Sequence, residues 1–152
     1  MSIQNLKQQL YNECESFLSE RANTLHEIIA GIQHSLQSET KSSAGDKHET
    51  GRAMLQLERE KAGNQFAAIQ KQQELLAKVN INAPSNVARL GSIIETNNGT
   101  YFLAISKGLV TIDKKPYFVI APQSPIGKLL LGKTVNSTFV FNTKQFTINT
   151  IN

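Results

Sequence analysis

The sequence predicts an α+β protein, in which an antiparallel two-helix coiled-coil hairpin precedes a small antiparallel sheet domain with one short helix. Three observations lead to this class. Residues 4–38 contain no proline and only one glycine, Gly31, so a long helix can form there. A second long helical pattern follows after a short turn. Beyond residue 84, the chain changes to short runs of β-branched and aromatic residues, which are typical of strands.

The first long helix is predicted from the spacing of its apolar residues. Steps of four and three residues alternate along Leu18, Ala22, Leu25, Ile29, Ile32 and Leu36. This spacing forms one narrow stripe, as in a coiled-coil seam. Leu10, Cys14 and Phe17 extend the stripe less regularly toward the N-terminus. A helix of about 35 residues would be roughly 50 Å long.

The second helix is expected from about Asp46 to Val79, after a turn-forming segment at residues 37–45. Its apolar residues recur every seven positions, with Phe66 between them: Leu55, Ala62, Ile69 and Leu76. Because the turn is short, the two helices should be antiparallel neighbours that cover each other's stripe. A four-helix bundle of two chains is the alternative, since one hairpin alone buries little apolar surface.

Six strands are predicted in the C-terminal part of the chain. They lie near residues 90–95, 100–106, 109–112, 117–121, 138–142 and 146–151. The dipeptide Asn98-Gly99 is a strong signal for a hairpin turn. We therefore expect a coiled-coil hairpin at residues 1–81, with its tip near 40–50, and a sheet domain at 82–152.

One short helix is predicted between the fourth and fifth of these strands. Ser124 can cap its N-terminus, and Pro125 suits the first helical position. Gly132 can end the helix, because glycine readily adopts the left-handed conformation found there. This helix should pack against the sheet.

Charge is distributed unevenly along the chain. Residues 1–84 hold nine Lys and Arg against ten Asp and Glu, whereas residues 85–152 hold seven against two. The basic C-terminal part could face nucleic acid or an acidic protein surface, or could simply be well solvated.

Cysteine usage and hydropathy indicate the compartment. Cys14 is the single cysteine, which excludes a disulfide framework within one chain and is typical of a reducing compartment. A thiol on the apolar stripe is expected to be a packed core residue rather than a nucleophile. The N-terminal residues lack a signal-peptide core, and no apolar run approaches the roughly 20 residues of a membrane span. A cytoplasmic protein without membrane contact is therefore expected.

The most informative polar cluster is Gly45-Asp46-Lys47-His48-Glu49, at the predicted tip of the hairpin. Asp46 and Glu49 are three residues apart, so on a helix they share one face. Two carboxylates can bind Mg²⁺ through their oxygens. The simpler structural interpretation is a capping box at the helix start. Because Mg²⁺ prefers six oxygen ligands, a metal role would require further ligands from a partner.

Two motifs in this arrangement resemble the GreA/GreB family of bacterial transcription elongation factors. Residues 45–49 match the family's G-D-x-x-E tip in place and spacing. Ser124-Pro125-Ile126-Gly127, followed by Leu130-Leu131-Gly132-Lys133, is similar to the family's S-P-I-x-x-x-L-I-G-K segment. The resemblance spans nearly the whole chain, and it implies an FKBP-like C-terminal domain.

The resemblance also implies a function. The hairpin would enter the secondary channel of bacterial RNA polymerase, while the C-terminal domain docks outside through Ser124, Pro125, Ile126, Gly127 and Lys128. Asp46 and Glu49 would be the catalytic and metal-binding pair: Asp46 as a ligand of a Mg²⁺ held mainly by the polymerase, Glu49 orienting a water. The polymerase would then cleave its own transcript in backtracked complexes, so this protein would not be an enzyme alone. Nascent RNA and DNA would lie nearby, and the protein would be a monomer or weak homodimer.

Other functions remain open at the level of the sequence. Thr50-Gly51-Arg52-Ala53 replaces the Asn-Ala-Glu-Tyr-like segment that usually follows the family's tip, which is consistent with a channel-binding regulator or inhibitor without cleavage activity. An FKBP-like domain also suggests a prolyl isomerase, although fold alone confers no activity. A protein that dimerises through its coiled coil is a third alternative.

Overall fold

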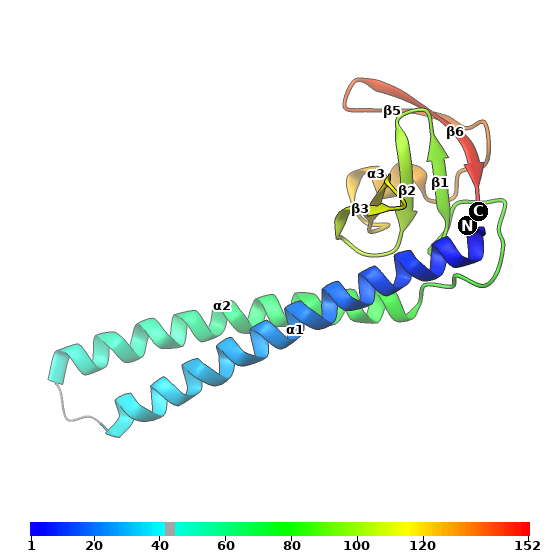
Figure 1. Cartoon of the computed structure of the whole chain (residues 1–152). Coiled ribbons are helices and arrows are strands. Elements are labelled where there is room, and N and C mark those ends of the chain that lie inside the picture. Colours follow the sequence, from blue (N-terminus) through cyan, green and yellow to red (C-terminus); the bar gives the residue numbers. More distant parts are fainter. Residues whose placement is uncertain (42–44) are drawn as a thin grey trace. The chain divides into compact units, whose positions relative to one another are not determined.

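The computed structural model describes the backbone of residues 1–41 and 45–152, and the side chains of residues 1–38 and 49–152. Two long helices, α1 (Ile3–Lys41) and α2 (Gly45–Ala77), precede six strands and one short helix, α3 (Pro125–Leu130) (Figure 1). The strands are β1 (Ile93–Thr96), β2 (Gly99–Leu103), β3 (Gly108–Ile112), β4 (Lys115–Ile120), β5 (Thr138–Phe141) and β6 (Lys144–Ile151). The predicted α+β class, with a helical hairpin before a small sheet domain, is confirmed.

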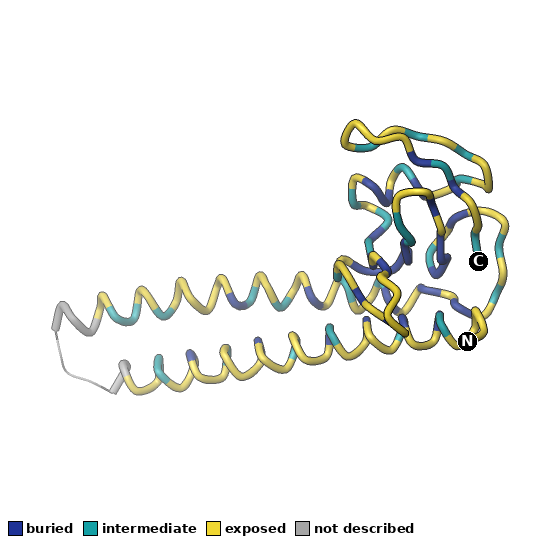
Figure 2. The backbone as a smooth tube through the Cα atoms, turned by 45° about the horizontal axis from the view of Figure 1, so that its top comes forward, coloured by how far each residue is buried: buried dark blue, intermediate teal, exposed yellow. Residues whose placement is uncertain are grey.

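Leu18–Lys71 forms one compact unit, in which the greater part of α1 and that of α2 lie side by side (Figure 1). The predicted stripes supply its buried seam: Leu18, Leu25 and Ile32 from α1, Ala62 and Ile69 from α2. Figure 2 shows buried positions recurring along both helices between longer exposed runs. Beside the seam, the ring of the exposed His26 contacts that of the half-buried Phe66, with their centroids 4.6 Å apart. Each helix thus buries the apolar stripe of the other within one chain.

The other compact unit combines Met1–Phe17 with Gln72–Asn152. It therefore includes the start of α1 and the end of α2 together with the sheet. The Gln72 side-chain carbonyl accepts a hydrogen bond from the Ser106 amide at 2.9 Å. The Lys107 ammonium lies over the Phe17 ring, 4.6 Å from its centroid. The predicted domain limits, residues 1–81 and 82–152, stay a prediction.

The sheet has the strand order β3-β4-β2-β1-β6-β5. Neighbouring strands pair antiparallel, except that β2 and β4 pair parallel. This mixed sheet differs from the purely antiparallel one that we expected. The difference arises because β3 and β4 form a hairpin that places its second strand, not its first, beside β2. The amide of Ala104 then donates to the carbonyl of Ile120 at 2.8 Å and extends this parallel ladder.

The two faces of the sheet are both covered, by different elements. One face contributes to a core that includes Ile94, Tyr101, Leu103, Phe146 and Ile148, and α3 adds Ile126 and Leu130 to the same core. Side chains alternate along a strand, so Ile93, Phe102 and Val119 point to the opposite face, where all three are buried. The start of α1 lies near that opposite face, since Leu6 and Ile93 line one cleft.

The hairpin between β5 and β6 provides a stability prediction. Asn142 and Thr143 both have positive φ, 51° and 66°, as a type I′ turn requires. A β-branched residue is costly in this conformation, which glycine adopts freely. We expect Thr143→Gly to raise the free energy of unfolding by about 1 kcal/mol, as urea denaturation would measure. Thr138→Gly, in β5 where φ is not positive, should lower it instead; a loss of stability for Thr143→Gly would contradict this account.

Candidate functional site

The acidic tip belongs to the first turn of α2, which begins at Gly45. The Glu49 side chain is exposed to solvent. The Asp46 side chain lies outside the described residues, so the predicted pairing of the two carboxylates, and with it their metal and catalytic roles, stays a prediction. A negative charge in this first turn is favourable in any case, because the helix N-terminus carries a partial positive charge.

Arg52 connects the two helices close to this tip. Its guanidinium Nη1 donates a hydrogen bond to the backbone carbonyl of Leu36 in α1, at 3.2 Å and partly buried. Leu36 lies five residues before the end of α1 at Lys41. The cation that the sequence places beside the acids therefore also joins α2 to α1.

The segment Ser124–Lys128 forms the start of α3, as predicted. Ser124 is the N-cap: its hydroxyl accepts a hydrogen bond from the Gly127 amide at 3.1 Å and donates one to the Ala121 carbonyl at 2.7 Å. Pro125 occupies the first turn, where a missing amide hydrogen costs nothing. One serine hydroxyl thus ties the helix start to the end of the preceding strand.

Gly127 is required by this close approach. A Cβ added at Gly127 would lie 2.1 Å from the carbonyl oxygen of Ala121 and 2.8 Å from the Ser124 hydroxyl. Neither group can move away easily, because one is backbone and the other is the helix cap. The glycine of the Ser124-Pro125-Ile126-Gly127 motif is therefore explained by packing within the domain.

The end of α3 also follows the predicted pattern. Leu131 is the C-cap, and Gly132 follows with a φ of +82°. The Gly132 amide donates to the carbonyl of Ala88 at 2.8 Å, and the Ala88 amide donates to the carbonyl of Lys133, also at 2.8 Å. The motif thereby connects α3 to the segment that leads into β1.

The five residues predicted to bind a partner differ in exposure. Ile126 and Gly127 are buried, Ser124 is half-buried, and Pro125 and Lys128 are exposed. Ile126 contributes to the core rather than to a surface. A direct contact with a partner would therefore involve Pro125 and Lys128, while the other three hold these two in position. Their partner-binding role stays a prediction.

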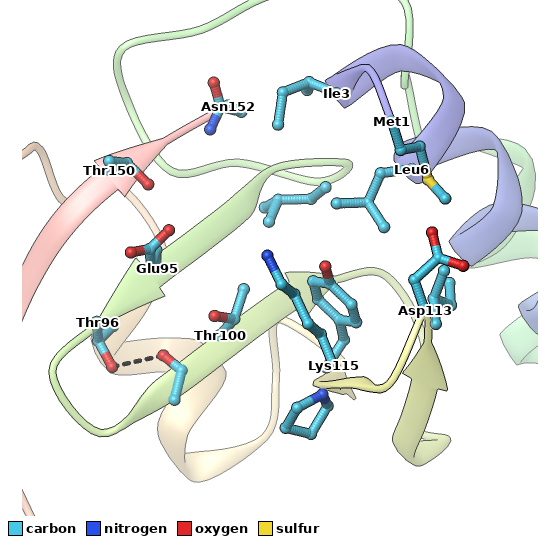
Figure 3. A pocket seen from close by; sticks show the side chains of 15 residues that line it. Met1, Ile3, Leu6, Glu95, Thr96, Thr100, Asp113, Lys115, Thr150 and Asn152 are labelled. Carbon is cyan, nitrogen blue, oxygen red and sulfur yellow. Dashed lines mark hydrogen bonds between the residues drawn. The ribbon is translucent and has the colours of Figure 1, made fainter.

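Sequence reasoning missed a polar cleft on the face of the sheet near the start of α1 (Figure 3). Glu95 comes from β1, Lys115 and Tyr117 come from β4, and Asp113 comes from the turn before β4. Ile3 and Leu6 of α1 complete its wall. No local pattern links these residues, because they are separated along the chain by up to about a hundred positions and only the fold brings them together.

Cys14 is fully buried, as predicted for a core thiol. Burial raises the pKa of the Cys14 thiol to about 12, with the charge of Glu13 adding to this rise and that of Lys107 opposing it. A thiolate is the reactive form, so this side chain is suited to packing rather than to nucleophilic chemistry.

Within the described part of the chain, no three His, Cys, Asp or Glu residues lie together in a group that could hold a metal ion. In that same part, none of the helices combines the length and apolar character needed to cross a membrane. No protein-family model matches this chain, and no curated protein matches it. The candidate function therefore depends on the hairpin, its acidic tip and the α3 motif.

Gly127→Ala should destabilise the protein. The added methyl group would collide with the Ala121 carbonyl, so we expect the free energy of unfolding to fall by about 1–3 kcal/mol in urea denaturation. Gly31→Ala is the matched control: its Cβ would meet nothing within 4 Å, and the change should stabilise α1 by about 0.5–1 kcal/mol. Equal effects of the two substitutions would contradict the packing role of Gly127.

Cys14 should resist alkylation in the native protein. Its pKa of about 12, against 9.0 for an ordinary thiol, reduces the thiolate fraction at mildly alkaline pH on the order of a thousandfold. Iodoacetamide labelling followed by mass spectrometry should be slow for the folded chain and fast in denaturant. Equally fast labelling in both states would show that Cys14 is accessible in solution.

Proposed function

We propose that this protein is a transcription elongation factor of the GreA/GreB type, which binds bacterial RNA polymerase and stimulates transcript cleavage in backtracked complexes. The strongest support for this proposal is that two features occur together in one chain. A long hairpin with Asp46 and Glu49 in the first turn of α2 precedes a sheet domain with the Ser124–Lys128 motif at the start of α3. In this proposal the sheet domain is FKBP-like.

The length of the hairpin suits a protein that reaches into a larger assembly. Helix α1 has 39 residues and is therefore about 58 Å long. Its seam with α2 is buried within the chain, so the hairpin does not require a second copy for stability. We expect a monomer, or at most a weak homodimer, that inserts its tip into the secondary channel of the polymerase.

The acids at the tip would complete an active site that belongs to the polymerase. Asp46 would ligate a Mg²⁺ held mainly by polymerase carboxylates, and Glu49 would orient the attacking water. Two carboxylates alone are too few for Mg²⁺, which needs about six oxygen ligands in near-octahedral geometry. A second metal in such chemistry stabilises the attacking or leaving oxygen of the phosphodiester. The protein would thus stimulate RNA hydrolysis without catalysing it alone.

The sheet domain would dock outside the channel. Pro125 and Lys128 are the exposed members of the predicted contact. Residues 85–152 also carry five more positive than negative charges, which favours approach to the acidic surfaces and nucleic-acid phosphates of an elongation complex. Nascent RNA and DNA are therefore close neighbours in this proposal.

A channel-binding regulator without cleavage activity is the second candidate. The observation that favours it is Arg52, whose guanidinium is engaged with the Leu36 carbonyl one turn after Glu49. A cation held in this place would lower the affinity of the tip for Mg²⁺. Such a protein would occupy the channel without accelerating hydrolysis.

Transcript shortening in a stalled, backtracked complex of a bacterial polymerase tests both candidates. We expect the wild type to accelerate Mg²⁺-dependent cleavage, and Asp46→Ala/Glu49→Ala to reduce the rate on the order of a hundredfold, because groups aimed at the reacting centre have effects of this size. Glu58→Ala/Glu60→Ala is the matched control, since it removes two exposed acids from the same helix.

The outcomes separate the candidates. Cleavage lost only in the tip variant supports the proposal. Polymerase binding without cleavage by any of the three proteins favours the regulator. Absence of binding by the wild type would overturn both candidates.

A further inference from the structure

A cleft of about 590 Å³ lies within the unit formed by Met1–Phe17 and Gln72–Asn152. Ile3 and Leu6 of α1 form part of an aliphatic wall, to which Ile93 and Ile112 of the sheet contribute. Figure 3 shows the side chains of Ile3 and Leu6 on the α1 side and those of Glu95, Asp113 and Lys115 on the sheet side. The cleft therefore combines a surface for methylene groups with charged groups.

Tyr117 is the buried polar group of this cleft. Its side chain is only 8% exposed, yet its hydroxyl forms no hydrogen bond with any residue in the described part of the chain. The hydroxyl oxygen also keeps some solvent contact, since no buried and unpartnered side-chain oxygen occurs among the described residues. It is thus an unused hydrogen-bonding group that opens into the cleft.

Two carboxylates act on the Tyr117 hydroxyl. Burial raises the pKa of Tyr117, and the charges of Asp113 and Glu95 raise it further. The two carboxylates therefore act on the same hydroxyl from different places, Glu95 from β1 and Asp113 from the turn between β3 and β4. Burial disfavours any charge at this point, whereas the two carboxylates favour a positive one.

We propose that this cleft binds a free aliphatic amine in its ammonium form. The nitrogen would lie beside the Tyr117 hydroxyl, between the carboxylates of Glu95 and Asp113. The methylene chain would pack against Ile3, Leu6 and the isoleucines of the sheet. An aliphatic wall offers nothing to a small hydrated metal ion, whereas it stabilises an alkyl chain by removing its methylene groups from water.

Substitution of Lys115 distinguishes an amine ligand from a zwitterionic or anionic one. Its side chain lines the same cleft, and its own ammonium ends in the space between the two acids (Figure 3). An amine ligand would compete with this ammonium, so removing it should strengthen binding. A zwitterionic or anionic ligand would instead use Lys115 as its partner, and removing it should weaken binding.

The test is a titration of the whole 152-residue chain, ¹⁵N-labelled and at low salt, with putrescine. Binding is measured from the changes in amide chemical shift. We expect saturable shifts around β1 and the β3–β4 turn. Glu95→Gln and Asp113→Asn should each weaken binding about fivefold, as for one partly exposed charge pair. Lys115→Met should tighten it, and Tyr117→Phe should weaken it. Asparagine is tolerated at residue 113, where φ is 50°, so the turn should be preserved.

Two controls make the result decisive. Glu74→Gln removes one exposed acid outside the cleft and should leave binding unchanged. The neutral analogue 1,4-butanediol should produce no saturable shift. The proposal is overturned if putrescine does not bind, if Glu74→Gln weakens binding as much as Glu95→Gln, or if Lys115→Met weakens it. Because none of these variants touches the tip of α2, this test is independent of transcript cleavage.

Discussion

The structure depends on the burial of one continuous apolar stripe along α1. The stripe is too narrow to form a globular core by itself, and it is too long to be covered by one small sheet. Its N-terminal part, with Leu10 and Cys14, is buried in the unit that contains the sheet, whereas Leu18, Leu25 and Ile32 are buried in the helical unit. One helix thereby takes part in two compact units, and the polar remainder of its surface stays in water. A break in this stripe would affect both.

The α3 motif illustrates how a structural requirement and a candidate function can share the same residues. Ser124 and Gly127 are explained by a helix cap and a close approach to the Ala121 carbonyl. These contacts hold Pro125 and Lys128 at the surface in one defined position. A partner that contacts Pro125 and Lys128 would therefore depend on their position, which Ser124 and Gly127 determine.

The tip and the cleft represent two different kinds of site. The acids of the tip are few, and Glu49 is exposed, so any metal chemistry there requires ligands from another molecule. The cleft contains its own apolar wall, two carboxylates and the hydroxyl of Tyr117, all from one chain. The first arrangement suits a factor that acts inside another enzyme, and the second suits a small ligand of this chain itself.

The sequence by itself determined the features that depend on neighbouring residues. Alternating steps of three and four predict the seam of α1, and Ser124, Pro125 and Gly132 predict the limits of α3. The six strands were also predicted, although β1 starts at Ile93 rather than near residue 90. Only the tertiary structure decided that β4 lies parallel to β2, that the start of α1 joins the sheet unit, and that Glu95, Asp113 and Tyr117 share a cleft. These features depend on contacts between segments that are far apart in the sequence. The periodicity of neighbouring residues predicts a helix or a strand, but it does not specify which distant segment that element packs against or pairs with.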